Sequence, residues 1–347
     1  MKPVRIAMLG SGFVADFYMQ GLADVPHQEV AVNYSRSVGR AEAFARKWGL
    51  HEFSTDMDAL IARDDLDLYV IALPNEDHLQ AGLKLANARR NQVCTKPLAR
   101  NGQEAGQLRD AAEASGALHG YAEIEVFAPA NVKARQVIES GALGKVLWVR
   151  SREAHSGPHS AHFWNVELTG GGAMHDLGCH CIEAARYFFG KQDAVTEVMA
   201  WGATLVHGDK TKGEDNALLM LKFASGGIAH CELSWTAKGG LDLRNEVHGT
   251  DGSIFTDVTR MTPISSFTTK PAGYVVEKAE INIGWTRPLP EEAFTYGYQA
   301  EMKHFVECVH DGRQPRETYE DGFIVNCILD AGYRSMREKS WVAVSYE

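Results

Sequence analysis

A glycine-rich turn directly after the first apolar run is the feature that most constrains the fold of this chain. The run Val4–Leu9 has the composition of a buried strand, and the turn after it reads Gly10-x-Gly12-x-x-Ala15. A helical pattern of apolar residues follows the turn. In a mononucleotide-binding βαβ unit the first glycine permits a tight turn, and the second lets backbone amides approach a pyrophosphate. The turn therefore predicts a Rossmann domain that binds a dinucleotide.

Strands and helices continue to alternate as far as Tyr121. The uniformly apolar run Leu68–Leu73 is typical of a central parallel strand, which is covered on both faces. The other expected elements are the strand Glu29–Tyr34, the helix Arg40–Trp48, the segment Met57–Ala62, the helix His78–Ala88, a strand that ends at Val93–Cys94, and the helix Gln103–Ser115. This rhythm predicts a doubly wound parallel sheet.

Beyond Tyr121 the rhythm changes, because several expected strands follow one another without helices between them. Consecutive strands with short turns indicate a mostly antiparallel or mixed sheet. The expected elements are the helices Asn131–Ser140, Asp176–Phe188, Tyr298–Val309 and Tyr319–Met336, and the strands Val146–Glu153, Thr196–Leu205, Ala217–Phe223, Gly227–Trp235, Asp242–His248 and Ser253–Asp257. The predicted class is thus α/β, with a Rossmann domain over residues 1–122 and an α+β domain with a large, mostly antiparallel sheet over residues 123–347.

Composition excludes some classes of function. The chain has 347 residues and a formal net charge of −10, and it lacks the basic runs with which proteins neutralise nucleic acid phosphates. No apolar run reaches the roughly 20 residues that span a bilayer, and the start of the chain does not resemble a signal peptide. Six scattered cysteines fit a reducing compartment. We expect a cytoplasmic protein that acts on a small molecule bound between two domains.

The end of the second expected strand bears on the choice of dinucleotide. Sites that prefer NAD usually carry an acidic residue there to hold the ribose hydroxyls. This chain instead reads Asn33-Tyr34-Ser35-Arg36-Ser37. Arg36 and its neighbouring serines suit a 2′-phosphate, which favours NADP, although an exposed arginine at a helix start would look the same. The cofactor is therefore expected to be NAD or NADP, with NADP favoured.

Three further segments carry a family resemblance. They are Leu73-Pro74-Asn75-x-x-His78, Cys94-Thr95-Lys96-Pro97-Leu98, and the stretch from Gly170 to His180. Together with the glycine turn, they resemble the Gfo/Idh/MocA family of sugar and cyclitol dehydrogenases over essentially the whole chain. The resemblance implies hydride transfer between NAD(P) and a carbohydrate hydroxyl, and it implies dimers or tetramers that pair through an open sheet face.

The motifs and the resemblance together give the candidate residues. The candidates for cofactor binding are Gly10, Gly12, Phe13, Val14, Ser35, Arg36, Leu73, Pro74, Asn75, His78, Lys96 and Pro97. The candidates for substrate binding are Lys96, Glu123, His155, His159, His162, Trp164, Asp176 and His180. Lys96, Asp176 and His180 are the expected catalytic residues.

The chemistry of alcohol oxidation requires the same kinds of residue. A base must take the hydroxyl proton, and a donor or cation must stabilise the developing alkoxide. Asp176 and His180 are four positions apart and would share one face of a helix. The alternatives are a surface lysine at Lys96, a helix N-cap at Asp176 and a core histidine at His180.

The Lys96 segment departs from the family pattern in one residue. Thr95 stands where the family has a glutamate, which puts the protonation of Lys96 in question and makes His180 the better principal base. Pro97 allows a cis peptide bond, although a trans bond is commoner.

A histidine-rich segment precedes the glycine triplet. His155, His159 and His162 lie within eight residues, followed by Phe163 and Trp164. Their irregular spacing does not match a zinc site, so we expect no metal. We expect the segment to bind a sugar ring, with a solvated loop as the alternative.

Two other functions use the same kind of scaffold. An NAD-dependent glycosidase oxidises its sugar transiently, eliminates the aglycone and reduces the product again. A regulator that senses NAD(P) would bind the dinucleotide without catalysis. The presence of Lys96, Asp176 and His180 favours the dehydrogenase over the regulator.

Overall fold

The computed structural model describes residues 2–260, 262 and 264–347, and the chain divides into two compact units. The first unit comprises Met1–Glu123 and Tyr298–Asn326, and the second comprises Ile124–Gly297 and Cys327–Glu347. The first division falls one residue after the expected boundary, but the return of residues 298–326 to the first unit was not expected. The Tyr298 ring stacks on that of Phe17 with centroids 4.8 Å apart. Apolar burial thus holds this late segment against the start of the chain.

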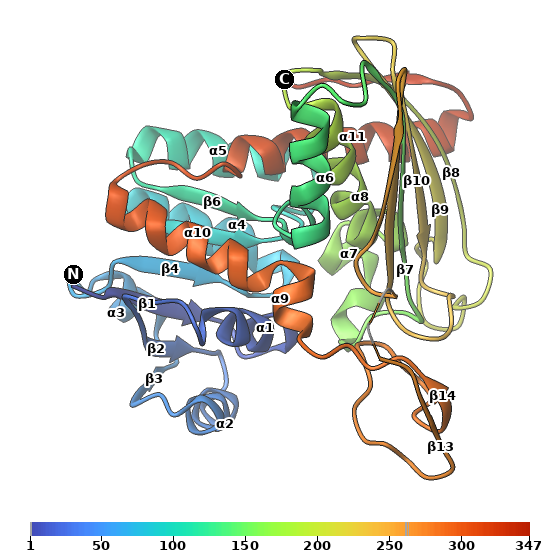
Figure 1. Ribbon diagram of the computed structural model, residues 1–347. Helices are drawn as coiled ribbons and strands as arrows, with labels where there is room; N and C mark the ends of the chain where they lie inside the picture. Colours follow the sequence, from blue (N-terminus) through green and yellow to red (C-terminus); the bar gives the residue numbers. More distant parts are fainter. Residues whose placement is uncertain (1, 261, 263) are drawn as a thin grey trace. The chain divides into compact units, whose positions relative to one another are not determined.

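The first unit is built on a six-stranded parallel sheet with the order β3-β2-β1-β4-β5-β6 (Figure 1). This order is that of a doubly wound dinucleotide-binding fold. Its strands are β1 (Val4–Leu9), β2 (Gln28–Tyr34), β3 (Glu52–Ser54), β4 (Leu68–Ile71), β5 (Gln92–Thr95) and β6 (His119–Ala122). Its helices are α1 (Phe13–Leu22), α2 (Val38–Trp48), α3 (Met57–Ile61), α4 (Asn75–Asn87), α5 (Gly102–Ser115), α10 (Tyr298–Asp311) and the first part of α11 (Tyr319–Glu338). The expected parallel sheet is confirmed.

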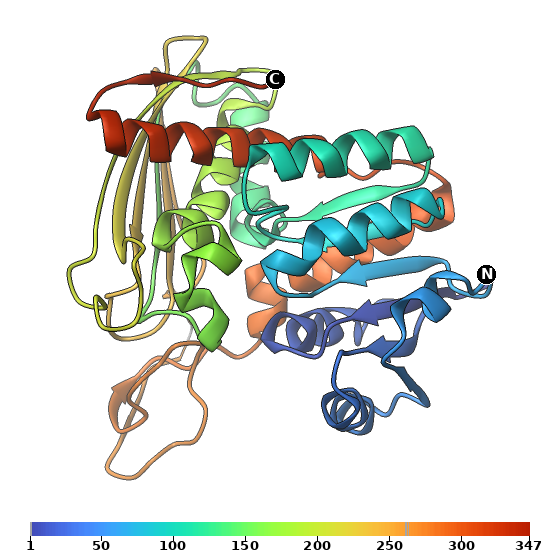
Figure 2. The ribbon, with the colours of Figure 1, turned by 180° about the vertical axis from the view of Figure 1, so that it is seen from behind.

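Helices cover both faces of this sheet. Figure 2 shows α4 and α5 in front of it, while α10 packs against α1 on the opposite face. All four residues of β4 are buried, which agrees with the apolar run that predicted a central strand. Parallel strands end at a common edge, so the turns after β1, β2, β4 and β5 gather at one edge of the unit.

The second unit is built on a seven-stranded sheet with the order β12-β11-β7-β10-β9-β8-β15. Its strands are β7 (Val146–Ala154), β8 (Val195–Ala203), β9 (Asn216–Phe223), β10 (Ile228–Ser234), β11 (Asp242–Gly249), β12 (Ser253–Asp257) and β15 (Val342–Ala343). Only the β7/β10 pair is parallel among the strand pairs of the described sheet. The expected mostly antiparallel sheet is confirmed.

The helix α8 (Ala173–Phe189) covers one face of this sheet. Along β7, Val149, Ser151 and Glu153 are buried, whereas Arg150 and Arg152 alternate with them and are partly exposed. This alternation gives the sheet a buried face and an open face. One cross-strand row on the open face consists of Trp201, Leu218, Glu232, Arg152, Arg244 and Asp257.

Several short elements of the second unit were not expected from the sequence. They are η1 (Ile124–Val126), η2 (Ala161–Trp164), α7 (Val166–Thr169), β13 (Ser266–Thr268), β14 (Gly284–Thr286) and α9 (Glu292–Tyr296). The remaining helix, α6 (Pro129–Glu139), was expected. Elements this short carry too little hydrophobic periodicity to be recognised.

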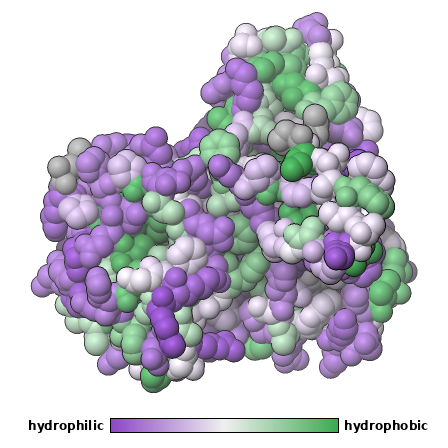
Figure 3. All heavy atoms as spheres, turned by 60° about the horizontal axis from the view of Figure 1, so that its bottom comes forward, coloured by the Kyte–Doolittle hydropathy of each residue, from purple (hydrophilic) through white to green (hydrophobic). Residues whose placement is uncertain are grey.

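The surface of the chain is mixed in character. Hydrophilic and hydrophobic residues are interspersed on the face drawn in Figure 3. Within the described residues, none of the helices combines the length and apolarity that a bilayer-spanning segment needs.

Candidate active site

The glycine turn after β1 is fixed by two neighbouring strands. Gly10 has a φ of +127°, and a Cβ atom built on it would lie 2.1 Å from the carbonyl oxygen of Ala72. The Asn33 amide donates hydrogen bonds to the carbonyl oxygens of Met8 (3.1 Å) and Gly10 (2.6 Å). A side chain at position 10 would therefore strain the backbone and overlap Ala72, which follows the last residue of β4.

Gly12 differs from Gly10 because the space beside it is open. A Cβ built on Gly12 would have nothing within 4 Å among the described atoms. The residue occupies the N-cap position of α1, where backbone N–H groups and the helix dipole favour an anion. Phe13 and Val14 begin the helix at the same place. The open space and the amides fit the pyrophosphate of a dinucleotide.

The end of β2 carries the polar residues expected to choose between NAD and NADP. Ser35 is buried, and the Ser11 hydroxyl donates a hydrogen bond to its Oγ at 3.1 Å. Arg36 forms an ion pair with Asp77 in the first turn of α4, with Nη1 and Oδ2 3.1 Å apart. The guanidinium thus already faces a carboxylate with which a 2′-phosphate would compete.

The Leu73-Pro74-Asn75-x-x-His78 segment forms the turn from β4 into α4. Asn75 begins the helix and is buried. His78 is fully buried, and its ring nitrogens lie 2.8 Å from the Leu73 carbonyl oxygen and 3.1 Å from the Pro97 carbonyl oxygen. Burial lowers the pKa of His78 and favours its neutral form. His78 thus joins the turn after β4 to the Lys96–Pro97 loop from inside the first unit.

The Lys96 segment follows the last residue of β5. The Lys96–Pro97 peptide bond is cis, as the sequence allowed. The Tyr18 hydroxyl donates a hydrogen bond to Thr95 Oγ1 at 2.8 Å. Burial raises the pKa of Tyr18 well above its ordinary value, so its hydroxyl stays protonated. The Thr95 hydroxyl is therefore satisfied by a hydrogen bond between two neutral groups.

In the second unit the glycine triplet brings the start of α8 close to Glu214, which precedes β9. A Cβ on Gly172 would lie 2.3 Å from the carbonyl oxygen of Glu214. The Glu214 carboxylate accepts hydrogen bonds from the Met174 N–H and from the Tyr333 hydroxyl, both at 2.9 Å through Oε1. Glu214, which is distant in sequence, thus accepts an N–H group at the start of this helix.

Asp176 and His180 lie on α8 as their spacing predicted, but the helix begins earlier than expected. Its N-cap position is Gly172, so the N-cap alternative for Asp176 is wrong. Asp176 Oδ2 accepts a hydrogen bond from Trp235 Nε1 at 3.0 Å. His180 Nε2 lies 3.8 Å from Glu153 Oε2 on β7. All four side chains are buried, and the two pairs lie between α8 and the sheet.

The described contacts of the histidine-rich segment give each histidine a different neighbour. His155 Nδ1 accepts the Gly157 N–H at 2.9 Å, and His159 Nε2 lies 3.4 Å from Glu277 Oε1. His162 packs against Phe163 with ring centroids 4.5 Å apart. The three histidines thus have separate neighbours.

Trp164, in the same segment, packs against Trp235, the residue that donates to Asp176 on α8. Its ring packs edge to face on Trp235 at 5.4 Å and on His207 at 5.0 Å, and Lys210 Nζ lies 5.1 Å from its centroid. Glu123, the remaining substrate candidate, is fully buried directly after β6 at the end of the first unit's N-terminal segment.

Three residues of this arrangement were missed by sequence analysis: Glu153, Glu214 and Trp235. Only Glu153 had a readable signal, because it is a charged residue at the buried phase of an alternating strand. Glu214 and Trp235 meet α8 only through the fold.

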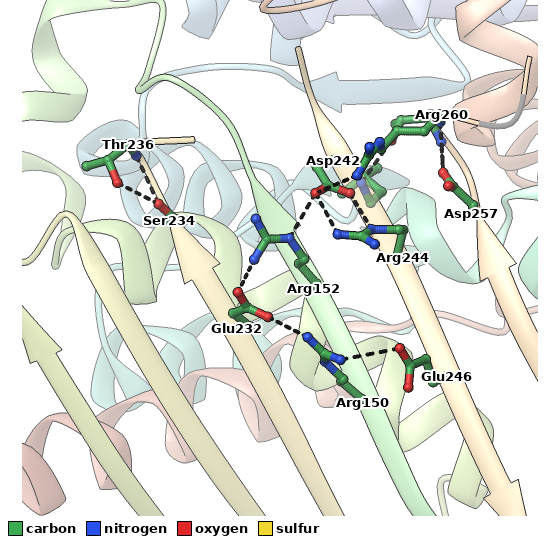
Figure 4. A network of polar contacts seen from close by, with 12 residues as sticks. Arg150, Arg152, Glu232, Ser234, Thr236, Asp242, Arg244, Glu246, Asp257 and Arg260 are labelled. Atoms are coloured by element: carbon green, nitrogen blue, oxygen red, sulfur yellow. Dashed lines mark hydrogen bonds and ion pairs between the residues drawn. The ribbon is translucent and has the colours of Figure 1, made fainter. Parts of the chain in front are cut away.

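Arg152 lies on the open face of the sheet, away from these residues. It pairs with Glu232 and, at 2.9 Å, with Asp242, within a network that also includes Arg150 and Arg244 (Figure 4). Lys238 pairs with Glu280 at 2.6 Å. Arg152 and Lys238 therefore both have carboxylate partners.

Known proteins share both units of this architecture. A family model described as "Oxidoreductase family, NAD-binding Rossmann fold" matches residues 4–122, and one described as "GFO/IDH/MocA C-terminal domain" matches residues 131–255. Levoglucosan dehydrogenase of Pseudarthrobacter phenanthrenivorans is 28% identical, with 99% of each chain covered. The scyllo-inositol 2-dehydrogenase (NAD(+)) of Bacillus subtilis is 27% identical, with 92% of this chain and 90% of the relative covered.

Solved structures agree along the whole length. GenD2 from gentamicin A biosynthesis, in complex with NAD, has a TM-score of 0.93 at 30% identity and covers 99% of this chain and 97% of its own. Levoglucosan dehydrogenase in complex with NADH and levoglucosan has a TM-score of 0.85 at 25% identity, with 99% and 100% covered. The protein therefore belongs to the Gfo/Idh/MocA family of oxidoreductases, and its first unit is the family's NAD-binding Rossmann domain.

Proposed function

We propose that this protein transfers a hydride between NAD(P) and a hydroxyl group of a sugar, glycoside or cyclitol. The observation that carries the proposal is the pair of buried polar side chains on α8, Asp176 and His180, each next to a partner from the sheet. The named activities of the relatives, on levoglucosan and scyllo-inositol, support the substrate class.

The cofactor is assigned to the turns at the carboxyl edge of the first sheet. The amides at Gly12 and the start of α1 would hold the pyrophosphate, and Ser35 would meet the adenosine ribose. The turn Leu73-Pro74-Asn75 would line the nicotinamide ring. When bound, the nicotinamide accepts or gives the hydride.

Proton transfer is assigned to His180. A neutral imidazole can accept the hydroxyl proton, and the nearby Glu153 carboxylate stabilises the imidazolium that forms. Lys96 would stabilise the developing alkoxide with its charge, and Asp176 would accept a hydrogen bond from the substrate. Of the remaining candidates, Trp164 would offer an apolar face to a sugar ring.

For the cofactor we propose a preference for NADP. The end of β2 has no acidic residue, and Arg36 would exchange its ion pair with Asp77 for the 2′-phosphate. Arg36→Ala should lower kcat/KM with NADP roughly 10-fold relative to NAD, because one charge-assisted pair to the phosphate is lost. An unchanged ratio of the two values would overturn the preference.

A substrate panel tests the reaction itself. Sugars, inositols and glycosides are incubated with NAD and with NADP, and reduced nicotinamide and released sugar are measured together. A dehydrogenase gives stoichiometric reduced nicotinamide. Release of sugar without net reduction would instead identify a glycosidase, and cofactor binding without any turnover would point to a regulator.

We also propose a cytoplasmic homodimer or homotetramer that pairs through the open face of the second unit's sheet. All six cysteines are buried thiols, as suits a reducing compartment. The open face exposes Trp148, Trp201 and Met220 beside complementary charged rows. Elution of the protein near its chain mass of 38.2 kDa in size-exclusion chromatography would contradict the oligomer.

A further inference from the structure

Trp235 is a buried tryptophan whose polar atom is directed at a proposed active-site residue. It follows the last residue of β10 and has no exposed surface. Its indole N–H donates to Asp176 Oδ2 at 3.0 Å. An indole N–H can only donate, so this contact favours the ionised form of the carboxylate.

The backbone of Trp235 is fixed on both sides. Its N–H donates to the Asp215 carbonyl oxygen at 2.8 Å, and its own carbonyl oxygen lies 3.1 Å from His207 Nε2. The Asp215 carboxylate in turn accepts the backbone N–H groups of Leu205, Val206 and His207 at 2.7–2.8 Å. The segment around residues 205–207 is thereby tied to the residue that holds Trp235.

The ring of Trp235 is also restrained. Trp164 packs edge to face against it, and the same Trp164 ring contacts His207. An indole held at its backbone and on its ring can keep a hydrogen bond in one direction, which is the requirement for a preorganised active-site carboxylate.

We propose that Trp235 is a positioning residue for the reaction, acting through Asp176. Its indole N–H holds one carboxylate oxygen, which fixes the direction of the carboxylate and favours its ionised form. This inference rests on the proposed function, because Asp176 must meet the substrate for the role to matter in catalysis.

The first test is kinetic and uses Trp235→Phe, which keeps an aromatic ring and removes the donor. We expect kcat to fall roughly 10-fold, the Kd for NADH to stay unchanged, and the acid limb of the pH profile of kcat/KM to move to higher pH. Trp285→Phe is the matched control and should behave as wild type, because Trp285 is 77% exposed on β14, outside the seven-stranded sheet.

A double-mutant cycle separates positioning from packing. In an Asp176→Asn background, Trp235→Phe should cause little further loss of kcat, because the carboxylate it orients is gone. If the losses multiply, or if the pH profile of the single variant does not move, Trp235 is only a core residue.

The second test needs no substrate. With ¹⁵N-labelled tryptophan, one of the seven indole N–H resonances should shift on acidification and should lose this response in Asp176→Asn. If no indole resonance responds to Asp176→Asn, the inference is wrong, whether or not Trp235→Phe folds. If the resonance responds as expected but no carbohydrate is turned over, the inferred contact stands and the proposed function fails.

Discussion

The helix α1 in the first unit and the helix α8 in the second unit both begin at a glycine N-cap, Gly12 and Gly172. The two helix starts differ in which residues fix them. In the first unit the open position, Gly12, and the strained position, Gly10, lie within three consecutive residues. In the second unit the helix start depends on Glu214 and Tyr333, and its two polar side chains depend on Glu153 and Trp235.

The difference follows from what each region has to hold. Backbone amides can bind a phosphate, and a short segment supplies them whatever the rest of the chain contains. Proton transfer needs side chains with set directions and charges, and these require partners from other strands. The proposed pyrophosphate site is therefore formed by one short segment, whereas the proposed proton-transfer residues depend on segments distant in sequence.

The largest effects are expected for the proposed catalytic residues themselves. Lys96→Ala and His180→Ala should each lower kcat by ~100-fold or more, because each removes a proton or charge function from the reaction. Cofactor affinity, measured by titration of NADH fluorescence, should remain intact in His180→Ala. Unchanged kcat in both variants would contradict the proposed catalytic roles of Lys96 and His180.

The glycine turn gives the next largest effect, with a matched pair of variants. Gly10→Ala should weaken NADH binding at least roughly 100-fold and lower the melting temperature, because it adds a Cβ at positive φ against the Ala72 carbonyl. Gly12→Ala meets open space, so the protein should melt as wild type while NADH binding weakens. Tight NADH binding by Gly10→Ala would break the comparison between the two regions.

A smaller effect is expected at the cap of α8. Glu214→Ala leaves the Met174 N–H and the Tyr333 hydroxyl without their shared acceptor, at a cost of about 2 kcal/mol in the free energy of unfolding. We expect kcat to fall roughly 10-fold with an unchanged Kd for NADH, since α8 carries Asp176. Glu214→Gln keeps an acceptor oxygen and serves as the control. A loss of NADH binding in Glu214→Ala would show that the two regions are not independent.

The smallest effect concerns α10, the late helix that belongs to the first unit. Burial, aided by Arg316 and Arg313, lowers the pKa of His304 to about 4. His304 Nε2 also accepts the Arg316 backbone N–H at 3.0 Å, which requires the neutral ring. The unfolded histidine has a pKa near 6.5, so acidification protonates the unfolded chain first and destabilises the fold as pH falls.

Thermal melts at several pH values check this expectation. Between about pH 7 and about pH 5, the wild-type melting temperature should fall by roughly 2–4 °C more than that of His304→Gln. Parallel curves for the two proteins would show that His304 is not the responsible group.

Particular residues show how far the sequence could be used. The glycine turn, the parallel alternation and the i, i+4 pair of Asp176 and His180 were read correctly, because each depends on spacing within one segment. The motif around His78 did not show that its ring lies inside the unit and joins two loops. Burial depends on which residues pack around a side chain in the fold, so a local motif cannot predict it.

The sequence by itself determined the order of strands and helices, the dinucleotide-binding turn and the family, since these follow from periodicity and from short motifs with fixed spacing. Only the tertiary structure decided that residues 298–326 complete the first unit, that Thr95 is satisfied by Tyr18, and that Glu153 and Trp235 stand beside His180 and Asp176. Each of these joins positions distant in the chain, where the pairing is set by packing and the exclusion of water and leaves no regular spacing in the sequence.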